Sequence, residues 1–558
     1  FNESGVMKKT STSGPIIFSA NPSLKIKKCT ANVISQNDCS LSIETTRSSS
    51  IENKYSTFYL LILNSNATEL IDSISIELSN GSTLNFSCKL SSDDNFKSIS
   101  MNKYAIAVKS KDSYEIISDC QFIENPDSFA SKEITFKDNY WGYYENYKIT
   151  SKKGIQGVSD SYTENLRAQH VLLNVDIEDL VWTSSYPGYV PYTYKGKTYY
   201  FSDLQALKKT IYDLHGWGSS EGNAYGEKHT RNVTIVLLLS WKYDELSYLI
   251  HPDARTKGTA SYYSLNMKDD TARKTYEALF CYLGEELGQM KERVNNWTLG
   301  NEVNSCNIWN YSGNMTFENY VTNYALAFQL LNQGIKRTAK SPRLFISLDH
   351  CWNTADAGYT GKEFLDYFAK YMDETAPCMQ WNVNYHPYSQ PLTRTDFWKD
   401  QSNTKNTVNT NYISMENIQV LTDYLSHVER TYGKSSDSIR VIIGEIGFSG
   451  KGGNASDEKY QAAALGYGYY IAMFNKRIDS YIIRAYLDAP TETASGLYLG
   501  LRQANYTQTQ KESYYVYQNL DTNSSLKIMN SYLNLIGISS WESAISGFDA
   551  SKLPAKDF

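Results

Sequence analysis

The sequence predicts an α/β protein in which a (β/α)8 TIM barrel follows an N-terminal β-sandwich domain. Apolar and polar residues alternate in short runs before Tyr147, whereas apolar runs alternate with helical patterns after it, and these later runs number eight. Strands of a parallel barrel are buried on both faces, so continuous apolar runs are expected of them. We expect the sandwich domain to span residues 1–148 and the barrel to span residues 149–558.

The N-terminal part shows the period of two that is typical of half-buried strands. The clearest runs are at residues 57–63, 73–78, 84–90 and 104–108. Asn80-Gly81 is a hairpin-type turn, which favours a β-sandwich. Beside an enzyme, such a domain either binds carbohydrate or braces the barrel. Bracing is favoured because no aromatic platform for a sugar is identifiable in this stretch.

Eight candidate barrel strands follow at residues 154–158, 170–175, 233–240, 296–300, 343–348, 380–385, 440–444 and 480–486. Helical patterns lie between them at residues 202–214, 269–294, 317–339, 361–372, 415–432 and 457–474. A doubly wound open sheet is the alternative fold, but no Gly-x-Gly-x-x-Gly motif or P-loop supports it. An aromatic, turn-rich insert at residues 183–200 either lines a sugar subsite or covers the barrel wall.

The composition makes some partners improbable. The 558 residues include 54 Lys and Arg against 60 Asp and Glu, so there is no basic surplus for a nucleic acid. No apolar stretch approaches the roughly 20 residues that a membrane-spanning helix needs. Phe1 opens a polar segment, so we expect that the sequence begins either after a removed leader or at an artificial boundary, and that the protein is secreted or lies at the cell surface. The composition does not indicate an oligomeric state.

The eight cysteines do not have the spacing of a metal site, and no cofactor is expected. Free buried thiols are slightly favoured over disulfides, because a chain of this length does not need cross-links for stability. Cys306 and Cys351 are the pair to test, since they fall in neighbouring loops after strands four and five. Asn296 begins a glycosylation sequon, yet the pattern places it in a buried strand where a glycan would not fit.

Two glutamates, Glu302 and Glu445, each follow a short apolar run, at the predicted ends of strands four and seven. In a barrel the carboxyl ends of all strands open into one bowl, so both carboxylates are expected there. Burial at such a rim can raise the pKa of a carboxyl group, and two of them suggest acid/base chemistry. The alternative is that each glutamate forms a structural ion pair with a rim Lys or Arg.

Three motifs together resemble those of glycoside hydrolase clan A, the retaining barrel glycosidases. They are Gly300-Asn301-Glu302 after strand four, Asn384-Tyr385-His386-Pro387-Tyr388 at strand six and Gly444-Glu445-Ile446-Gly447 at strand seven. The resemblance covers roughly residues 150–500 in order and spacing, and it points to a bacterial branch of the clan. It implies the hydrolysis of β-glycosidic bonds in a poly- or oligosaccharide, without a cofactor.

The resemblance also assigns roles to the two glutamates. Glu302 corresponds to the acid/base and Glu445 to the nucleophile of a double displacement. Such a mechanism needs two carboxyl groups about 5–5.5 Å apart, one protonated to assist the leaving oxygen and one ionised to attack the anomeric carbon.

Neighbouring residues in the motifs are candidates to support this pair. Asn301 resembles the clan's Asn that binds the sugar 2-hydroxyl, although it could instead cap a turn. Either Tyr388 or Tyr385 could donate a hydrogen bond to Glu445, and the choice between them stays open. His386 could contact sugar or carboxylate, or it could be a packing residue.

Further residues at the ends of predicted strands are candidates for substrate binding. Indole rings stack on the apolar faces of pyranose sugars, while Asp and His side chains form hydrogen bonds with hydroxyl groups. Trp241 follows strand three, and Asp349, His350 and Trp352 follow strand five. Tyr486 lies at strand eight, where the clan often has an aromatic residue. Each of these residues has equal odds of being a packing residue.

Two other functions compete with a glycosidase. A non-catalytic carbohydrate-binding protein on a barrel scaffold would be expected to have lost one carboxylate, but both are present. A metal-dependent hydrolase would need His and Asp clusters at strand ends, and the chain has only seven His. The sequence therefore favours the retaining glycosidase.

Overall fold

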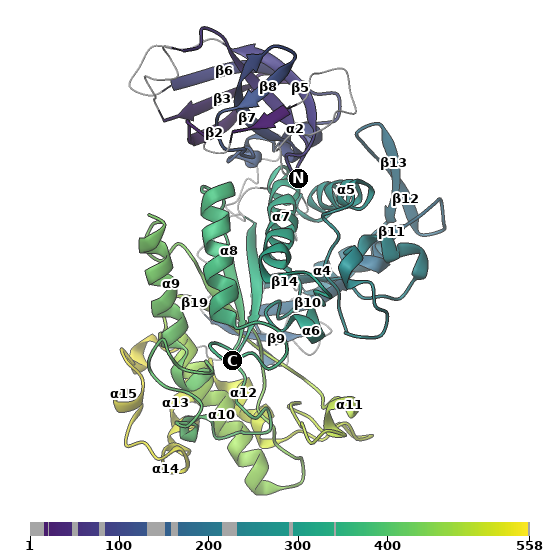
Figure 1. Ribbon diagram of the computed structural model, residues 1–558. Helices are drawn as coiled ribbons and strands as arrows, with labels where there is room; N and C mark the ends of the chain where they lie inside the picture. Colours follow the sequence, from purple (N-terminus) through teal and green to yellow (C-terminus); the bar gives the residue numbers. More distant parts are fainter. Residues whose placement is uncertain are drawn as a thin grey trace.

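The computed structural model describes residues 16–19, 22–46, 54–76, 84–130, 151–157, 166–214, 231–289, 294–339 and 342–555. Its main body is a closed barrel of parallel strands in the order β10-β14-β15-β16-β17-β18-β19-β9. Figure 1 shows this barrel with its helices and, at the top, the separate sheets formed by the N-terminal part. The predicted fold class, a TIM barrel preceded by a sheet domain, is confirmed.

The N-terminal part forms two sheets that enclose a common core. The first consists of β1 (Ile16–Phe18), β8 (Ser113–Ile116), β7 (Lys103–Ser110), β4 (Phe58–Leu63) and β5 (Leu70–Ile76). The second consists of β2 (Ile26–Val33), β3 (Asp38–Thr45) and β6 (Leu84–Ser91). Every second residue of β3 is buried, as expected for a strand with one face on a core. Leu41 of one sheet and Leu60 and Ile106 of the other belong to the same hydrophobic cluster.

Asn80-Gly81, the predicted hairpin turn, lies outside the described residues. The strands on either side of it, β5 and β6, belong to different sheets. The predicted domain boundary after residue 148 also lies outside the described residues and stays a prediction.

The N-terminal sheets pack against the amino ends of the barrel strands. Helix α2 (Lys97–Met101) contacts the last turns of α7 (Phe317–Lys336), which lead into the fifth barrel strand. Ser100 Oγ donates to the backbone oxygen of Gln333 at 3.2 Å, and Gln333 Nε2 donates to the backbone oxygen of Ile123 at 2.8 Å. This arrangement leaves the opposite end of the barrel uncovered by the sheets, which favours the bracing role over a second sugar site.

All eight predicted barrel strands are present. They are β9 (Lys153–Gln156), β10 (His170–Asp176), β14 (Asn232–Leu238), β15 (Asn296–Leu299), β16 (Arg343–Asp349), β17 (Asn382–His386), β18 (Val441–Ile446) and β19 (Ile478–Ile483). Leu172, Val236, Leu238 and Ile482 form a small cluster of their own, contributed by three of these strands. Asn296 is 1% exposed in β15, so its burial was predicted correctly.

The predicted helices are present, with small shifts at their ends. The main ones are α4 (Gln205–Leu214), α5 (Asp270–Leu287), α7, α8 (Gly361–Thr375), α9 (Gln419–Thr431) and α10 (Ala455–Phe474). Helix α9 begins later than predicted because Met415–Asn417 forms a 3-10 turn with a Ser414 capping box. Helix α5 ends earlier than predicted, with Gly288 as its C-cap.

Shorter helices follow the barrel strands or close the chain. They are α6 (Cys306–Trp309), α11 (Pro490–Thr493), α12 (Glu512–Asn519), α13 (Ser525–Asn530), α14 (Leu533–Ile536) and α15 (Trp541–Ala544). None of the helices in the described part of the chain has the length and apolar character needed to cross a bilayer.

The aromatic insert after the second barrel strand covers helix α5. It forms a small sheet of β11 (Val181–Trp182), β13 (Lys197–Ser202) and β12 (Tyr189–Tyr194). The rings of Tyr192 and Tyr282 lie 5.3 Å apart between their centroids, and Tyr194 Oη donates to Glu277 Oε2 at 2.6 Å. Of the two roles considered for the insert, these contacts support covering the barrel wall.

Candidate active site

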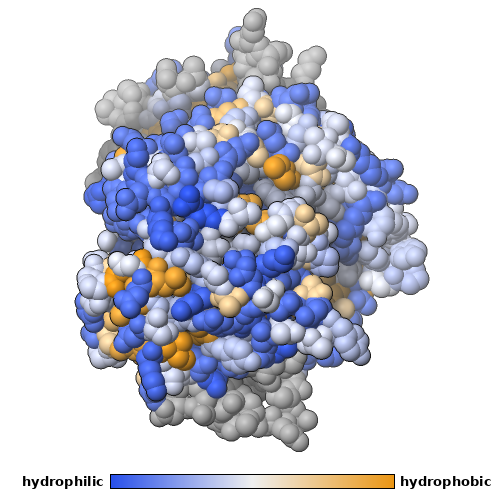
Figure 2. Space-filling model, turned by 90° about the horizontal axis from the view of Figure 1, so that it is seen from below, coloured by the Kyte–Doolittle hydropathy of each residue, from blue (hydrophilic) through white to orange (hydrophobic). Residues whose placement is uncertain are grey.

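A cavity of about 730 Å³ lies at the carboxyl ends of the barrel strands. Its walls come from β10, from Asp349 of β16 and Glu445 of β18, and from the loops after β14, β15, β16, β17 and β19. Figure 2 views the molecule from this end and shows a mostly hydrophilic face with separate hydrophobic patches. Glu302 and Glu445 both line the cavity, as the strand count predicted.

Glu302 stands on a tightly constrained turn after β15. Its φ of 42° lies in the left-handed region that non-glycine residues rarely adopt and that is concentrated at functional sites. The turn is tied to the neighbouring strand, because the backbone N–H of Glu302 donates to Ser347 Oγ at 3.0 Å. Gly300 precedes it with φ of 71°, and a Cβ there would lie 2.9 Å from Val303 Cγ1. The side chain of Glu302 is therefore held in a defined position.

The surroundings of Glu302 favour its protonated form. Burial raises the pKa of the Glu302 carboxyl, and the negative charges of Asp349 and Glu445 act in the same direction. His386 opposes this shift, because its Nδ1 lies 2.8 Å from Glu302 Oε1. Burial disfavours a charge on His386, but the hydrogen bond with Glu302 and the nearby negative charges together outweigh burial and raise the pKa of the imidazole. Glu302 and His386 thus form a buried pair that holds a proton.

Glu445 has the opposite surroundings, with donors directed at its carboxylate. Tyr388 Oη donates to Oε1 at 2.9 Å, and Gln156 Nε2 donates to Oε2 at 3.2 Å. Arg484 Nε lies 3.9 Å from Oε1. The preceding residue must be glycine, because a Cβ at Gly444 would lie 2.0 Å from Asn384 Oδ1. Hydrogen bonds to both oxygens and a nearby guanidinium stabilise a negative charge on Glu445.

Several other predicted site residues also line the cavity, namely Asn301, Asp349, His350 and Tyr388. Asp349 anchors the loop after β15, since it accepts hydrogen bonds from Asn304 Nδ2 at 2.5 Å and from the Ser305 hydroxyl. His350 Nε2 lies 3.3 Å from Gln390 Oε1 across the cavity wall. Of the two tyrosines considered as partners of Glu445, Tyr388 makes the contact.

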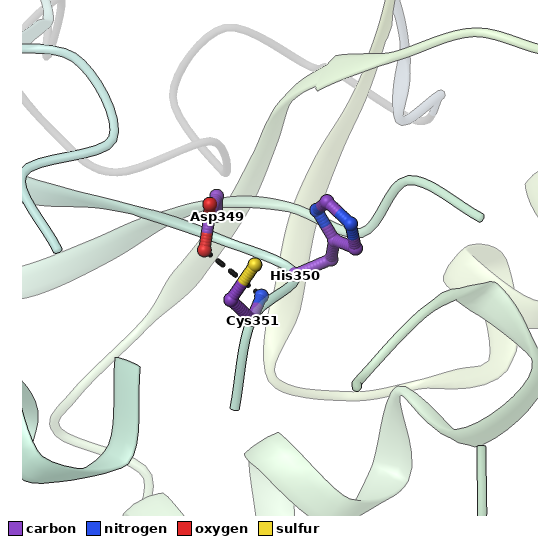
Figure 3. Close-up of side chains that lie close together, drawn as sticks. All are labelled: Asp349, His350 and Cys351. Atoms are coloured by element: carbon purple, nitrogen blue, oxygen red, sulfur yellow. Dashed lines mark hydrogen bonds between the residues drawn. The ribbon is translucent and has the colours of Figure 1, made fainter. Parts of the chain in front are cut away.

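Asp349, His350 and Cys351 form the one group in the described part of the chain that could hold a metal ion, with ligand atoms within 4.8 Å of one another. Figure 3 shows the hydrogen bond from the Cys351 backbone N–H to Asp349, with the His350 ring on the other side. Both Asp349 oxygens already accept hydrogen bonds from Asn304 and Ser305. Burial raises the pKa of the Cys351 thiol well above its usual range, which disfavours the thiolate that a metal would bind. These residues therefore serve to fix the loops.

Besides His386, which contacts Glu302 but does not line the cavity itself, four predicted site residues do not line the cavity. Tyr385 is buried in the core outside the barrel, because alternate residues of a strand face opposite sides and His386 faces inward. Trp352 is fully buried and donates to the backbone oxygen of Val408 at 3.0 Å. Trp241 Nε1 donates to Asp244 Oδ1 at 2.9 Å.

The fourth of these residues, Tyr486, packs away from the cavity. Its ring lies 6.2 Å from that of Tyr514, and the Arg502 guanidinium lies 5.1 Å from its centroid. The cavity near strand eight is lined instead by Arg484, Leu497 and Leu499.

The cysteines carry no cross-link in the structure, and all eight are free thiols. Cys306 and Cys351 are both buried, and Cys306 Sγ accepts a hydrogen bond from Ser312 Oγ at 3.3 Å. The thiols are free, as expected, but only five of the eight are buried, since Cys88 and Cys120 are half-buried and Cys378 is exposed.

Two residues contact Glu445 that the sequence did not connect with it, although Arg484 was placed at the rim after strand eight. Gln156 is the last residue of β9 (Lys-Gly-Ile-Gln), a strand too short and too polar to point to it from the sequence. Arg484 directly follows β19, and Glu492 Oε1 accepts from its Nε at 2.8 Å.

Several solved structures are similar to this chain. The chain is similar to a family 39 glycoside hydrolase from Bacteroides cellulosilyticus WH2, with 12% identity, a TM-score of 0.42 and coverage of 88% of this chain and 82% of that one. It is similar to a β-glucosidase from Pyrococcus furiosus, with 14% identity, a TM-score of 0.40 and coverage of 64% and 82%. For a β-glucuronidase from Bacteroides uniformis the identity is 11%, the TM-score 0.35 and the coverage 89% and 51%, so the chain spans about half of that protein.

No curated protein sequence matches the chain. A family model matches residues 145–544 and is described as "Family of unknown function (DUF5722)". Because this match covers most of its length, the chain belongs to that family.

Proposed function

We propose that this member of the family is a retaining glycoside hydrolase that cleaves β-glycosidic bonds in a poly- or oligosaccharide. One observation carries the proposal: a single cavity holds two glutamates with contrasting surroundings. Glu302 is buried with a raised pKa, whereas Glu445 accepts hydrogen bonds from Tyr388 and Gln156. Retaining glycosidases need this combination of a protonated acid and an ionised nucleophile.

In the proposed first step, a Glu445 oxygen attacks the anomeric carbon while Glu302 gives its proton to the glycosidic oxygen. The bond between the anomeric carbon and that oxygen breaks, and the leaving sugar departs with the proton. Glu445 then carries the glycosyl group as an ester. In the second step Glu302, now ionised, takes a proton from water, and the resulting hydroxide oxygen displaces Glu445. Two inversions give net retention of configuration.

The neighbouring residues have roles in this scheme that follow from their contacts. Tyr388 and Gln156 orient the two oxygens of Glu445 for attack. Arg484 compensates its charge from 3.9 Å. His386 orients Glu302 and supplies the partner that its carboxylate needs after the proton has been transferred. Asn301, next to the acid in the cavity wall, is the proposed ligand of the sugar 2-hydroxyl.

The experiment compares wild type, Glu302→Ala and Glu445→Ala on a panel of β-linked glucans, xylans, mannans and galactans, with product anomers followed by NMR. We expect wild type to release product with retained configuration on at least one glycan. Glu445→Ala should have no measurable activity on it. Glu542→Ala, at an exposed position of α15, is the matched control and should behave as wild type.

Two results would contradict the proposal. Full activity of Glu445→Ala would exclude Glu445 as the nucleophile. Hydrolysis by wild type with inversion of the anomeric configuration would show that Glu445 does not act as a nucleophile.

We also propose a secreted or cell-surface location, because a polysaccharide substrate lies outside the cell. Immunodetection in culture medium and cell fractions of the native organism tests this.

A further inference from the structure

One wall of the cavity is apolar and aromatic, in contrast to the carboxylates around it. Tyr262 comes from the loop after β14, while Ile308 and Trp309 come from α6 after β15. The rings of Tyr262 and Trp309 lie 6.3 Å apart between centroids, with their planes inclined at 34°. Ile308 is 43% exposed, so its aliphatic surface is accessible from the cavity. We refer to Tyr262, Ile308 and Trp309 as the aromatic wall.

The aromatic wall is held in place by the backbone. The N–H of Ser261 donates to the oxygen of Ile308 at 2.9 Å, and the N–H of Tyr311 donates to the oxygen of Tyr262 at 2.9 Å. These two hydrogen bonds join the loop that carries Tyr262 to the segment that carries Ile308 and Trp309. Tyr262 also packs against the cluster of Leu172, Val236, Leu238 and Ile482. A surface that is rigid before the ligand arrives loses little entropy on binding.

The aromatic wall lies on the side of the cavity from which the leaving group of the proposed reaction departs. Ile308 and Trp309 lie on the same loop as Glu302, the proposed acid, whereas Glu445 stands on β18, three strands further round the barrel. Arg484, Leu497 and Leu499 occupy the side of the cavity next to Glu445. The acid must reach the glycosidic oxygen, so the leaving sugar lies on the side of Glu302.

We propose that the aromatic wall is a subsite that binds an uncharged pyranose ring of the substrate on the leaving-group side. The apolar C–H face of a pyranose matches an exposed aromatic surface of this kind. The assignment of the aromatic wall to the leaving-group side rests on the proposed function. The inference adds where the leaving sugar binds and that this sugar is uncharged.

The charges of the cavity indicate that this sugar is uncharged. The acidic residues that line the cavity are Glu302, Asp349, Asp356, Glu445 and Glu492. Among the lining residues in the described part of the chain, Arg484 is the single Lys or Arg. Its guanidinium already binds Glu492 and lies beside Glu445. A sugar carboxylate would therefore meet repulsion without a free cation to pair with.

Binding is tested first in the Glu302→Gln background, by calorimetry with cellotetraose, laminaritetraose, xylotetraose and mannotetraose. We expect Trp309→Ala to weaken the best of these ligands about tenfold or more. Trp309→Leu, which keeps apolar volume without a ring, should weaken it similarly and guards against misfolding of the alanine variant. Tyr515→Ala, at an exposed tyrosine of α12 outside the cavity, is the matched control and should bind as the parent does.

Kinetics then locate the subsite. With active Glu302, Trp309→Ala should lower kcat/KM about tenfold on the tetrasaccharide, yet leave kcat/KM on the corresponding glycosyl fluoride within about twofold. Fluoride does not reach the aromatic wall. Equal losses on both substrates would overturn the leaving-group assignment, as would no loss on either. Trigalacturonate should bind at least tenfold more weakly than the best neutral tetrasaccharide, and tighter binding would overturn the uncharged class.

The two proposals fail in distinguishable ways. If hydrolysis depends on Glu302 and Glu445 but no binding depends on Trp309, the subsite is wrong and the proposed function stands. If no tetrasaccharide is hydrolysed but binding still depends on Trp309, the sugar subsite stands and the proposed function is wrong. If none of the tetrasaccharides binds at all, the subsite is overturned.

Discussion

The two ends of the barrel treat charged side chains in opposite ways. At the amino ends, opposite charges are paired: Asp479 Oδ2 lies 2.5 Å from Arg343 Nη1 and 3.2 Å from Arg440 Nε. At the carboxyl ends, several carboxyl groups share one cavity, with Glu302 and Glu445 among its lining. The first arrangement stabilises a folded protein, and the second is the arrangement that the proposed acid/base chemistry requires.

The pKa directions reflect the same contrast. Burial opposes ionisation of Asp479, but Arg343 and Arg440 outweigh burial and lower the pKa of its carboxyl. Burial of Glu302 is reinforced by Asp349 and Glu445, so the pKa of its carboxyl is raised. A carboxyl group with a raised pKa keeps a proton that it can donate, whereas one with a lowered pKa cannot serve as an acid at neutral pH.

The largest expected effect is at the cavity end. Glu302→Gln should lower kcat/KM on the active glycan by about 10²–10⁴-fold, because the general acid is lost. The thermal midpoint should be equal to that of wild type or higher, because one of several facing carboxylates is removed. Steady-state kinetics and calorimetry on the same preparation check this. A lower thermal midpoint of Glu302→Gln together with its lower kcat/KM would contradict the contrast between the two ends of the barrel.

At the amino end the same kind of change should affect stability alone. Arg477 Nη1 lies 2.6 Å from Glu429 Oε1, with side-chain exposures of 4% and 2%. Arg477→Met leaves Glu429 buried without its cation and should destabilise the fold by about 3–5 kcal/mol. Thermal unfolding should show a lower midpoint, while kcat/KM at 25 °C, well below that midpoint, stays as in wild type.

The matched control for Arg477 is an exposed pair. Lys370 Nζ and Glu374 Oε1 lie 3.0 Å apart on α8, with exposures of 58% and 54%. Lys370→Ala should leave the thermal midpoint unchanged, because water screens such a pair. An equal loss in Lys370→Ala and Arg477→Met would show that burial does not decide the strength of these pairs.

A smaller effect is expected on the pH profile. The pKa of Glu302 is raised, so the acid is present below that pKa and is lost as pH rises through it. His386 lowers the pKa of Glu302 by its hydrogen bond and charge. His386→Phe removes both, so the alkaline limb of kcat/KM should move to higher pH. An unmoved or lowered limb would contradict the pairing.

Much of the fold was predictable because barrel strands are buried on both faces. The apolar runs at residues 233–240 and 440–444 correspond to β14 and β18, and Glu445 stands at the predicted strand end. Glu302 was found for the same reason, since the end of a strand fixes a position in the barrel. Cavity residues that follow a strand directly were within reach of the sequence.

Residues on longer loops were not predictable, because tertiary contacts decide where such loops lie. Tyr262 and Trp309 come together through backbone bonds between two loops that no local pattern reveals. Trp352 follows a strand yet turns into the core, where Val408 accepts its indole N–H. The sequence did not separate Tyr385 from His386, because a shift of one residue along β17 moves a side chain from one face of the strand to the other.

The most direct test of the central claim is to trap the nucleophile. Wild type is incubated with 2-deoxy-2-fluoro glycosyl fluorides of glucose, galactose, mannose and xylose, and the labelled peptide is identified by mass spectrometry. The proposed mechanism predicts one fluoroglycosyl group attached to Glu445 by an ester bond. A label on Glu302 or on any other residue, or hydrolysis with inversion and no label, would contradict it.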